Sequence, residues 1–267
     1  MRTIAITGAA SGIGASTAAR LKSEGHRVIG VDLHETDITA DLSTPAGRKT
    51  AIDQILEQCA GTLDGFVPCA GLSGLPDRPG SLLASLNYFG SIELIEGLRE
   101  ALAQSDAASV VGLCSNSTTT APGISMELVD ALTAGDEEAA RALGDKTGSI
   151  MTYPATKMAL ARWLRKNAVS DEWIGQGINL NAIAPGKTET AMVAEGRADP
   201  ILGKHMDAFP MPIGRNGRPE EIASLICYLL GPEARFIVGS VIFIDGGTDA
   251  LFRANDFPAP MPIPNQD

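Results

Sequence analysis

Short apolar runs alternate with longer amphipathic stretches along most of the chain. Each apolar run is continuous, whereas the stretch that follows it repeats its apolar residues at helical spacing. Continuously apolar strands that alternate with helices predict a parallel sheet covered by helices on both faces, which is a doubly wound α/β fold. The strands are predicted at residues 4–7, 26–32, 63–69, 109–114, 178–184 and 241–244, and the helices at residues 14–23, 44–59, 81–102, 153–169 and 219–230.

Two segments depart from this alternation. Residues 118–148 are rich in Thr, Gly, Glu and Ala and form a predicted insertion, with helices expected at residues 127–132 and 137–143. The tail at residues 257–267 contains Pro-Ala-Pro-Met-Pro-Ile-Pro, which favours an extended polyproline conformation and cannot continue a helix. We expect a loosely ordered terminus there, with packing over a neighbouring subunit as the alternative. Because no low-complexity linker divides the chain, we predict a single domain over residues 1–267.

The bulk composition is that of an ordinary globular protein, and it narrows the possible partners. Hydrophobic residues make up 44% and charged residues 20% of the 267 positions, and the formal net charge is −11. A negative field repels polyanions, so we expect neither nucleic acid nor an anionic membrane as a partner. An anionic cofactor would need local attraction, such as the positive end of a helix.

The cysteines and the N-terminal segment bear on the location of the protein. Cys59, Cys69, Cys114 and Cys227 lie far apart, with no Cys-x-x-Cys pair and no histidine cluster beside them. We therefore expect reduced thiols and no metal site. No apolar run approaches the roughly 20 residues that span a bilayer, and no signal peptide is recognisable before the first strand. These features predict a cytoplasmic protein.

A glycine-rich turn joins the first predicted strand to the first predicted helix, where residues 7–14 read Thr-Gly-Ala-Ala-Ser-Gly-Ile-Gly. Glycines keep side chains out of a tight turn and let the backbone approach a phosphate. The helix that follows offers free N–H groups and its positive end to the same phosphate. This turn predicts a Rossmann-type dinucleotide site, to which we assign Gly8, Ser11, Gly12, Ile13 and Gly14.

An acidic residue ends the second predicted strand. Asp32 lies about 20 residues after the turn, where a carboxylate accepts hydrogen bonds from the adenosine ribose hydroxyls. A 2′-phosphate there would meet a like charge, and no Lys or Arg lies within residues 7–14 or directly after Asp32. We therefore predict NAD rather than NADP as the cofactor, with Asp32 and Leu33 at the ribose. The alternative is a solvated carboxylate in a turn.

A tyrosine and a lysine lie on one face of a predicted helix, in the segment Tyr153-Pro154-Ala155-Thr156-Lys157. A phenol has a reference pKa of about 10, which is too high for an efficient base at neutral pH. We expect the Lys157 ammonium to lower the pKa of Tyr153, and Pro154 suits the first turn of a helix. By itself such a pair is common on protein surfaces, so its weight comes from the motifs around it.

Several motifs, in their order along the chain, resemble those of the short-chain dehydrogenase/reductase family. The resemblance extends from residue 3 to about residue 249 and implies oxidation of alcohols or reduction of ketones with a nicotinamide cofactor. The resembling pieces are residues 7–14, Asp32, Asp41-Leu42, Cys69-Ala70-Gly71, Asn87, Ser115, Tyr153 with Lys157, Asn181, Pro185-Gly186 with Thr188 and Thr190, and Asp245-Gly246-Gly247.

The resemblance implies a role for each member of a catalytic set. Ser115 would hydrogen-bond the substrate oxygen, and Tyr153 would donate or accept its proton. Lys157 would bind the nicotinamide ribose, and Asn87 would shape the helix that holds a proton-relay water. The other implied cofactor contacts are Asp41 and Leu42 at the adenine, Cys69, Ala70 and Gly71 after the third strand, and Pro185, Gly186, Thr188 and Thr190 at the nicotinamide.

The chain departs from the family pattern at the ends of two strands. Pro68-Cys69 replaces the usual Asn-Asn before Ala-Gly, which removes side-chain hydrogen bonds but keeps the close approach of the backbone. Cys114-Ser115 replaces the usual Ser-Ser. We therefore assign Ser115 by its register in the strand, with Ser117 as the alternative.

The interval between Ser115 and Tyr153 is longer than is usual in the family, because residues 118–148 are inserted. This insertion and several flanking segments resemble the bacterial hydroxysteroid dehydrogenase branch of the family, which implies steroid alcohols and varied ketones and aldehydes as substrates. We expect an apolar substrate pocket, with ordinary packing of an amphipathic helix as the alternative. Its predicted residues are Ile183, Met192, Val193, Ile201, Leu202 and Met206.

The insertion also affects the expected assembly. In this family the helices that carry Asn87 and Tyr153 commonly pair between subunits, and inserted helices beside them would obstruct that contact. We predict a homodimer that forms through the last strand and the helix at residues 219–230.

The sequence thus predicts NAD-dependent interconversion of a secondary alcohol and a ketone, with a hydroxysteroid or a similarly bulky apolar substrate. The alternatives are an oxidoreductase of a non-steroid alcohol and a non-catalytic NAD-binding regulator, although a regulator would normally lack the catalytic set. The Tyr153/Lys157 pair disfavours a methyltransferase, and a sugar epimerase would need a longer C-terminal domain.

Overall fold

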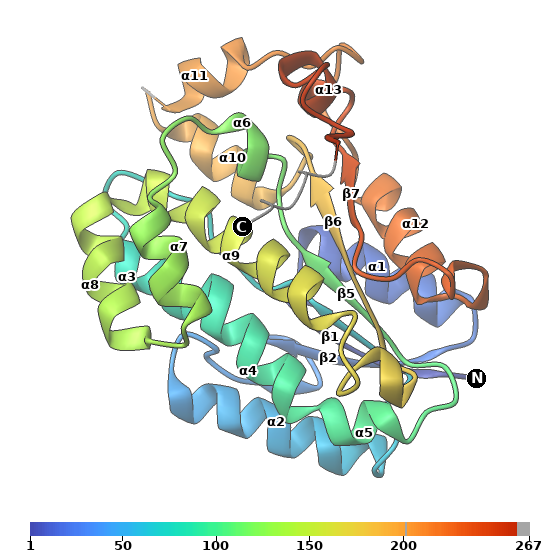
Figure 1. The fold of residues 1–267 in the computed structure, drawn as a ribbon. Helices are drawn as coiled ribbons and strands as arrows, with labels where there is room; N and C mark the ends of the chain where they lie inside the picture. The colour runs from blue at the N-terminus through green and yellow to red at the C-terminus, as the bar shows by residue number, and fades with distance from the viewer. Residues whose placement is uncertain (201, 261–267) are drawn as a thin grey trace, which may run out of the picture.

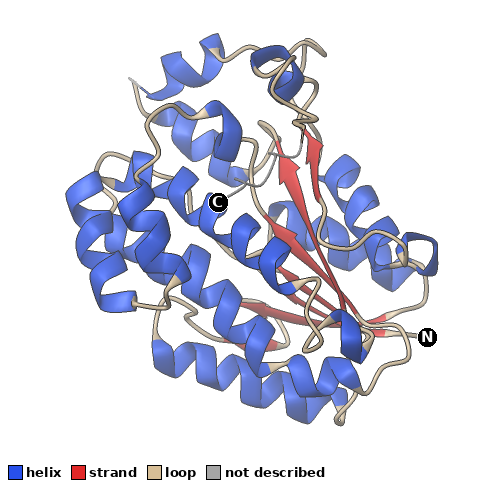
Figure 2. Cartoon of the chain, viewed as in Figure 1, coloured by secondary structure: helices blue, strands red, loops and turns tan. Residues whose placement is uncertain are grey.

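Parallel strands form one twisted sheet through the centre of the molecule (Figures 1 and 2). The computed structural model describes residues 1–200 and 202–260. The order of the strands across the sheet is β3-β2-β1-β4-β5-β6-β7, and every neighbouring pair is parallel. The strands are β1 (Thr3–Thr7), β2 (Arg27–Asp32), β3 (Ile38–Thr39), β4 (Gly65–Pro68), β5 (Ser109–Leu113), β6 (Asn179–Pro185) and β7 (Val241–Ile244).

Helices cover both faces of the sheet, and each face has its own apolar core. Side chains alternate between the faces along a strand, so Val110 joins one core and Val111 joins the other. The doubly wound parallel fold and all six predicted strands are therefore confirmed, and β3 is an additional short strand. One face is covered by α2 (Pro45–Cys59), α4 (Gly90–Gly97), α5 (Arg99–Ala103) and α9 (Ser149–Asn167), and the other by α1 (Gly12–Ser23) and α12 (Pro219–Leu230).

The helix predicted at residues 81–102 is interrupted, so the prediction of one continuous helix is wrong. After α3 (Gly80–Leu83) the chain forms the π-helical segment η1 (Ala84–Phe89) and only then continues as α4. Within this segment the backbone N–H of Gly90 donates to the carbonyl of Ser85, five residues earlier. Turns of this kind are rare and occur mostly at functional sites.

The insertion folds as helices that pack beside the sheet. It contains α6 (Ser117–Thr120), α7 (Met126–Thr133) and α8 (Glu137–Thr147), so the two helices predicted there are confirmed. Ser125 and Asp136 cap α7 and α8, because their side chains accept hydrogen bonds from backbone N–H groups of the first turn. In Figure 1, α7 and α8 lie together beside α9.

Helix α9 begins at Ser149, one turn earlier than predicted. Pro154 therefore lies in the helix interior, and its predicted place in the first turn is wrong. The earlier start follows from Gly148, whose positive φ of 80° sets the junction between α8 and α9. Pro154 has no N–H to offer the Ile150 carbonyl, but Ile150 lies on the exposed side of the helix, where water can satisfy that group.

The described part of the chain ends in an exposed segment. Residues 258–260 are exposed and lie outside helices and strands, whereas the rest of the predicted extended tail, residues 261–267, lies outside the described residues. Within the described part of the chain, no helix is both long and apolar enough to cross a lipid bilayer. The remaining elements are η2 (Ile174–Gln176), α10 (Ala191–Ala198), α11 (Leu202–Ala208), η3 (Pro232–Ala234) and α13 (Thr248–Phe252).

Candidate active site

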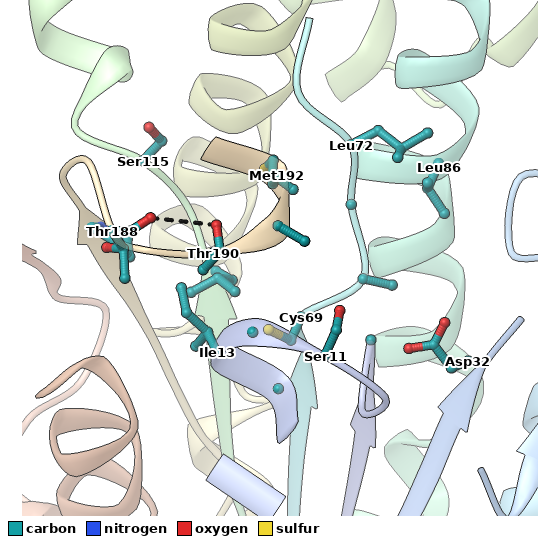
Figure 3. A pocket seen from close by; sticks show the side chains of 18 of the residues that line it. Ser11, Ile13, Asp32, Cys69, Leu72, Leu86, Ser115, Thr188, Thr190 and Met192 are labelled. Atoms are coloured by element: carbon teal, nitrogen blue, oxygen red, sulfur yellow. Dashed lines mark hydrogen bonds between the residues drawn. The ribbon is translucent and has the colours of Figure 1, made fainter. Parts of the chain in front are cut away.

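A pocket opens at the carboxyl ends of the strands, where the order of the sheet reverses between β1 and β4. Ligands of open α/β sheets bind at such a switch point. Figure 3 shows Asp32 and Ser115 far apart in this pocket, with Ser11, Ile13 and Cys69 between them. The predicted site residues that line it are Gly8, Ser11, Gly12, Ile13, Gly14, Asp32, Leu33, Asp41, Leu42, Cys69, Ala70, Gly71, Ser115, Tyr153, Lys157, Pro185, Gly186, Thr188 and Thr190.

The glycine turn leaves its backbone uncovered on the pocket side. A Cβ atom on Gly14 would lie 2.1 Å from the carbonyl oxygen of Gly8, so no other residue fits at position 14 without moving the turn. Gly8 has a φ of 68°, and a Cβ on it would lie 2.9 Å from the backbone nitrogen of Ala70. Helix α1 begins directly after Ser11, so its first N–H groups face this end of the pocket. The turn therefore fits the diphosphate of a dinucleotide.

The carboxylate of Asp32 is held by backbone donors beside the turn. The Ala10 N–H donates to one of its oxygens at 3.0 Å, and the Leu33 N–H donates to the other at 2.7 Å. A carboxylate accepts about four hydrogen bonds, so capacity remains for two ribose hydroxyls. Asp41 and Leu42 line the same pocket.

The hydroxyl groups of Tyr153 and Ser115 meet at the opposite part of the pocket. Burial raises the pKa of Tyr153, and the hydrogen bond from Ser115 opposes this rise. Ser115 lines the pocket, whereas the alternative residue Ser117 does not. The Ser117 N–H instead donates to the Ser115 hydroxyl at 3.1 Å, which helps to fix the position of that oxygen.

The ammonium group of Lys157 is buried close to Tyr153. It donates to the carbonyl oxygen of Leu113 at 2.8 Å and lies 5.9 Å from the centre of the Tyr153 ring. Burial lowers the pKa of Lys157 itself. The expected lowering of the Tyr153 pKa by Lys157 is not found: the pKa is raised, with burial as the largest cause, and the group that lowers it is Ser115.

Among the predicted catalytic and cofactor-binding residues, Asn87 is the one that does not line the pocket. It is fully buried in the π-helical segment, where its side chain pairs with the backbone of Leu72. The Leu72 N–H donates to Oδ1 at 2.8 Å, and Nδ2 donates to the Leu72 carbonyl at 2.9 Å. Nδ2 also lies 3.5 Å from the hydroxyl of Thr156, next to Lys157 in the chain. Asn87 thus joins the pocket wall to the helix that carries Tyr153.

The segment after Ser115 is anchored to the end of the chain. The Asn116 side chain donates to Asp245 at 3.3 Å, and the Thr119 hydroxyl donates to Asp249 at 2.6 Å. Asp245, the first residue of the Asp-Gly-Gly motif after the last strand, therefore supports the segment that follows Ser115, although Asp245 itself does not line the pocket.

The turn after β6 forms one wall of the pocket. The Thr188 hydroxyl donates to the carbonyl of Gly186 at 3.0 Å, and the Thr190 hydroxyl donates to the carbonyl of Thr188 at 3.3 Å (Figure 3). A Cβ on Gly186 would lie 2.8 Å from Asp245, so the turn requires a residue without a side chain there. Pro185 lines the same wall.

Apolar side chains also line the pocket. Met192 and Val193 lie there as predicted, and Leu72 and Leu86 line it in addition. In Figure 3, Met192 lies between Ser115 on one side and Leu72 and Leu86 on the other. Leu72 follows the Ala-Gly pair and Leu86 precedes Asn87, so each adjoins a recognised motif. An ion pair between Arg78 and Glu195 at 2.9 Å links the segment after Leu72 to α10.

Three of the predicted pocket residues lie elsewhere. Ile183 points into the core beneath α12, because alternation along β6 turns it away from the pocket, so its prediction is wrong. Leu202 and Met206 are also wrongly predicted, since they pack on Gly196 between α10 and α11. Ile201 lies outside the described residues. The other residues missed along the pocket adjoin predicted ones and are Val31, Ala40, Leu113, Cys114 and Ala191.

The four cysteines are free thiols. Cys69 and Cys114 line the pocket, and burial raises the pKa of each to about 12. Both are therefore protonated and unreactive at neutral pH. Across residues 1–200 and 202–260, no group of three or more His, Cys, Asp or Glu side chains is arranged to hold a metal ion.

A doubly wound parallel sheet with a glycine turn at its switch point, and a serine, tyrosine and lysine in the same pocket, defines the class of nucleotide-dependent oxidoreductases. A family model described as enoyl-(acyl carrier protein) reductase matches residues 8–249. The chain belongs to the short-chain dehydrogenase/reductase family, and it is an oxidoreductase.

Similar proteins of known activity cover nearly the whole chain. It is 38% identical over 260 residues to the 3-alpha-hydroxysteroid dehydrogenase/carbonyl reductase of Comamonas testosteroni, covering 96% of this chain and 100% of that protein. It is 32% identical to the coniferyl-alcohol dehydrogenase of a Pseudomonas species, covering 93% and 97% of the two chains. A solved structure of the 3-alpha-hydroxysteroid dehydrogenase from Pseudomonas sp. B-0831 in complex with NADH superimposes with a TM-score of 0.91 at 44% identity, covering 96% of this chain and 100% of that one.

Proposed function

We propose that this protein interconverts a secondary alcohol and a ketone with NAD as the cofactor, and that its substrate is a hydroxysteroid or a similarly bulky apolar molecule. The observation that carries the proposal is the arrangement of Ser115, Tyr153 and Lys157 in the pocket that also contains the glycine turn and Asp32. One cleft thus offers a dinucleotide site and a proton donor.

The choice of NAD rests on the charges in the pocket. Asp32 presents a carboxylate where the adenosine ribose would lie, and it would repel a 2′-phosphate. Lys157 is the single Lys or Arg among the described residues that line the pocket, and it lies at the end with Tyr153. No cation near Asp32 therefore compensates a phosphate. The NADH complex of the Pseudomonas relative agrees with this choice.

Tyr153 is the proposed general acid and base. In alcohol oxidation its phenolate would accept the hydroxyl proton, and in ketone reduction its phenol would donate a proton to the carbonyl oxygen. Ser115 would donate a hydrogen bond to the substrate oxygen and hold it beside Tyr153. When bound, the nicotinamide supplies the hydride acceptor or donor.

Lys157 has two proposed tasks in the same step. Its ammonium, held by the carbonyl of Leu113, would hydrogen-bond the ribose next to the nicotinamide. It also places a positive charge near the phenol, where a phenolate forms during the reaction. Because Lys157 is buried, this charge acts in a medium of low polarity and is weakly screened.

The apolar side chains that line the pocket support a bulky apolar substrate. Leu72, Leu86, Met192 and Val193 offer hydrocarbon surface, and Met192 adapts easily to different shapes. Burial of a hydrocarbon skeleton against them is favourable by about 25 cal/mol per Å² of apolar surface. The names of the relatives, a hydroxysteroid dehydrogenase/carbonyl reductase and a coniferyl-alcohol dehydrogenase, agree with substrates of this kind.

The proposal is tested by Tyr153→Phe and the matched variant Tyr228→Phe, which changes a half-exposed tyrosine on α12. Reduced nicotinamide is followed by absorbance with 3-hydroxysteroids, other secondary alcohols and an enoyl thioester as substrates. We expect Tyr153→Phe to lose about 10²- to 10⁴-fold in kcat and to keep its affinity for NAD, while Tyr228→Phe stays active. If the wild-type protein binds NAD but turns over none of these substrates, the result would indicate a non-catalytic regulator. If it turns over the thioester alone, the result would indicate an enoyl reductase.

We further propose that the protein is a cytoplasmic homodimer. The free thiols are typical of a reducing compartment. Helices α7 and α8 cover α9, whereas β7 is an edge strand with the exposed Phe236 just before it and Tyr228 nearby on α12. Exposed aromatic residues beside a free sheet edge are typical of an interface. Light scattering should give the mass of a dimer, and a monomer at assay concentrations contradicts this proposal.

A further inference from the structure

Helix α8 of the insertion contacts the π-helical segment η1. The guanidinium of Arg141 donates to the hydroxyl of Ser85 at 2.6 Å. Ser85 is fully buried, and its carbonyl accepts a hydrogen bond from the N–H of Gly90, five residues later, as in a π-helix. Arg141 does not line the pocket. Arg141 thus contacts a residue next to the pocket-lining Leu86 without entering the pocket itself.

Other contacts fix α8 at the distance that this hydrogen bond requires. A Cβ on Gly80 would lie 2.0 Å from the carbonyl oxygen of Gly144, so α3 and α8 touch backbone to backbone. The Ser81 N–H donates to the Asp145 carboxylate at 2.8 Å, one residue further along both helices. At the start of α8, the Glu137 carboxylate accepts two hydrogen bonds from a buried arginine, Arg48 of α2. The helix is therefore held at both ends as well as at Arg141.

The π turn positions residues of the active site. Leu86 and Asn87 follow Ser85 directly; Leu86 lines the pocket, and Asn87 pairs with the backbone of Leu72. A π turn holds one residue more per turn than an α-helix and is less stable in isolation. Relaxation to α-helical geometry, with its rotation of about 100° per residue, would change the direction of Asn87 relative to Ser85 and disturb its pairing with Leu72. A contact that fixes Ser85 opposes this relaxation.

We propose that Arg141 is a positioning residue, and that the insertion stabilises the π turn which sets Asn87 and the apolar wall of the pocket. This inference rests on the proposed function, because it concerns the same reaction. It assigns the insertion a catalytic task in addition to covering α9. It also predicts that the effect of Arg141 passes through Ser85.

Three variants of α8 test this inference: Arg141→Met, the conservative Arg141→Lys, and Lys146→Met, which removes an exposed cation from the same helix. A hydrogen bond from a charged donor is stronger than one between neutral groups. Its loss in Arg141→Met should therefore lower kcat by about tenfold to a hundredfold. The affinity for NAD should stay close to wild type, and the melting temperature should fall by a few degrees, because the same hydrogen bond also contributes to stability. Arg141→Lys should recover most of the rate, and Lys146→Met should be unchanged.

Ser85→Ala provides an independent arm. It should reproduce the loss in kcat, and combining it with Arg141→Met should add little, because both variants remove one contact. A lowered melting temperature with normal kcat in Arg141→Met would overturn the inference, as would additive losses in the double variant. Tyr153→Phe, assayed in parallel, separates the two proposals: if it alone is inactive, the proposed function stands and the role of Arg141 fails.

Discussion

Arg48 offers the sharpest test of how the insertion is attached. Its side chain is 1% exposed and makes three hydrogen bonds, one to Glu93 at 2.7 Å and two to Glu137 at 3.2 and 2.6 Å. We consider Arg48→Met, which keeps the aliphatic stem and removes the charge. The two carboxylates then lose their partner, and α8 loses its link to α2.

The expected cost follows from burial. Removing one partner of a buried ion pair costs about 3–5 kcal/mol, mainly because the other partner stays buried without compensation. Here the Glu93 and Glu137 side chains are 40% and 23% exposed, so water reaches both and the cost lies at the lower end, about 3 kcal/mol. For a chain of this size, that corresponds to a fall in Tm of about 6–12 °C.

Urea unfolding followed by circular dichroism measures the free energy, and calorimetry measures Tm. Lys49→Met is the matched control, because Lys49 pairs with Asp53 at 2.7 Å on the surface of α2, where such pairs contribute about 0–1 kcal/mol. Equal losses in the free energy of unfolding for the two variants would refute the reasoning, because burial would then not change the contribution of an ion pair to stability.

Three further predictions concern the site and its support. Burial raises the pKa of Tyr153, so the rate of alcohol oxidation should increase with pH into the alkaline range. Because the hydrogen bond from Ser115 opposes this rise, Ser115→Ala should move the pH profile of kcat/KM to higher pH. An unshifted profile in Ser115→Ala argues against this hydrogen bond. Asp32→Ala should narrow the preference for NAD over NADP by about tenfold or more, as measured by kcat/KM with each cofactor, and an unchanged ratio assigns the preference to another residue. Gly80→Ala should lower the free energy of unfolding in urea by about 1–3 kcal/mol, because its Cβ forces α3 and α8 apart. The control Gly175→Ala should change this free energy little, because its Cβ would lie at 3.4 Å from Asp171. Equal losses for the two variants would contradict the backbone contact between Gly80 and Gly144.

Local sequence patterns predicted most of the fold and several of the residues that line the pocket. Apolar runs located the strands, and the glycine turn, Asp32, Tyr153 and Lys157 each followed from neighbouring residues in the chain. The two-residue strand β3 escaped because it is too short for a periodic pattern.

The features that escaped prediction depend on contacts between distant segments. Nothing near Asn87 in the sequence predicts a π turn, and the contacts of that turn come from distant segments: Asn87 pairs with Leu72, and Ser85 accepts a hydrogen bond from Arg141 of α8. Likewise, Ile183 has a suitable composition for the pocket, but the register of β6 turns it into the core. The pKa of Tyr153 follows from burial, which residue spacing does not reveal.

The backbone contact between Gly80 and Gly144 also limits how this family can be engineered. An insertion transplanted into another member would need a glycine on the receiving helix as well as its own, because any side chain at either place collides with the opposite backbone. The two glycines therefore act as a matched pair of attachment points, one in the shared scaffold and one in the added segment. Library designs that shuffle segments between relatives should exchange positions 80 and 144 together.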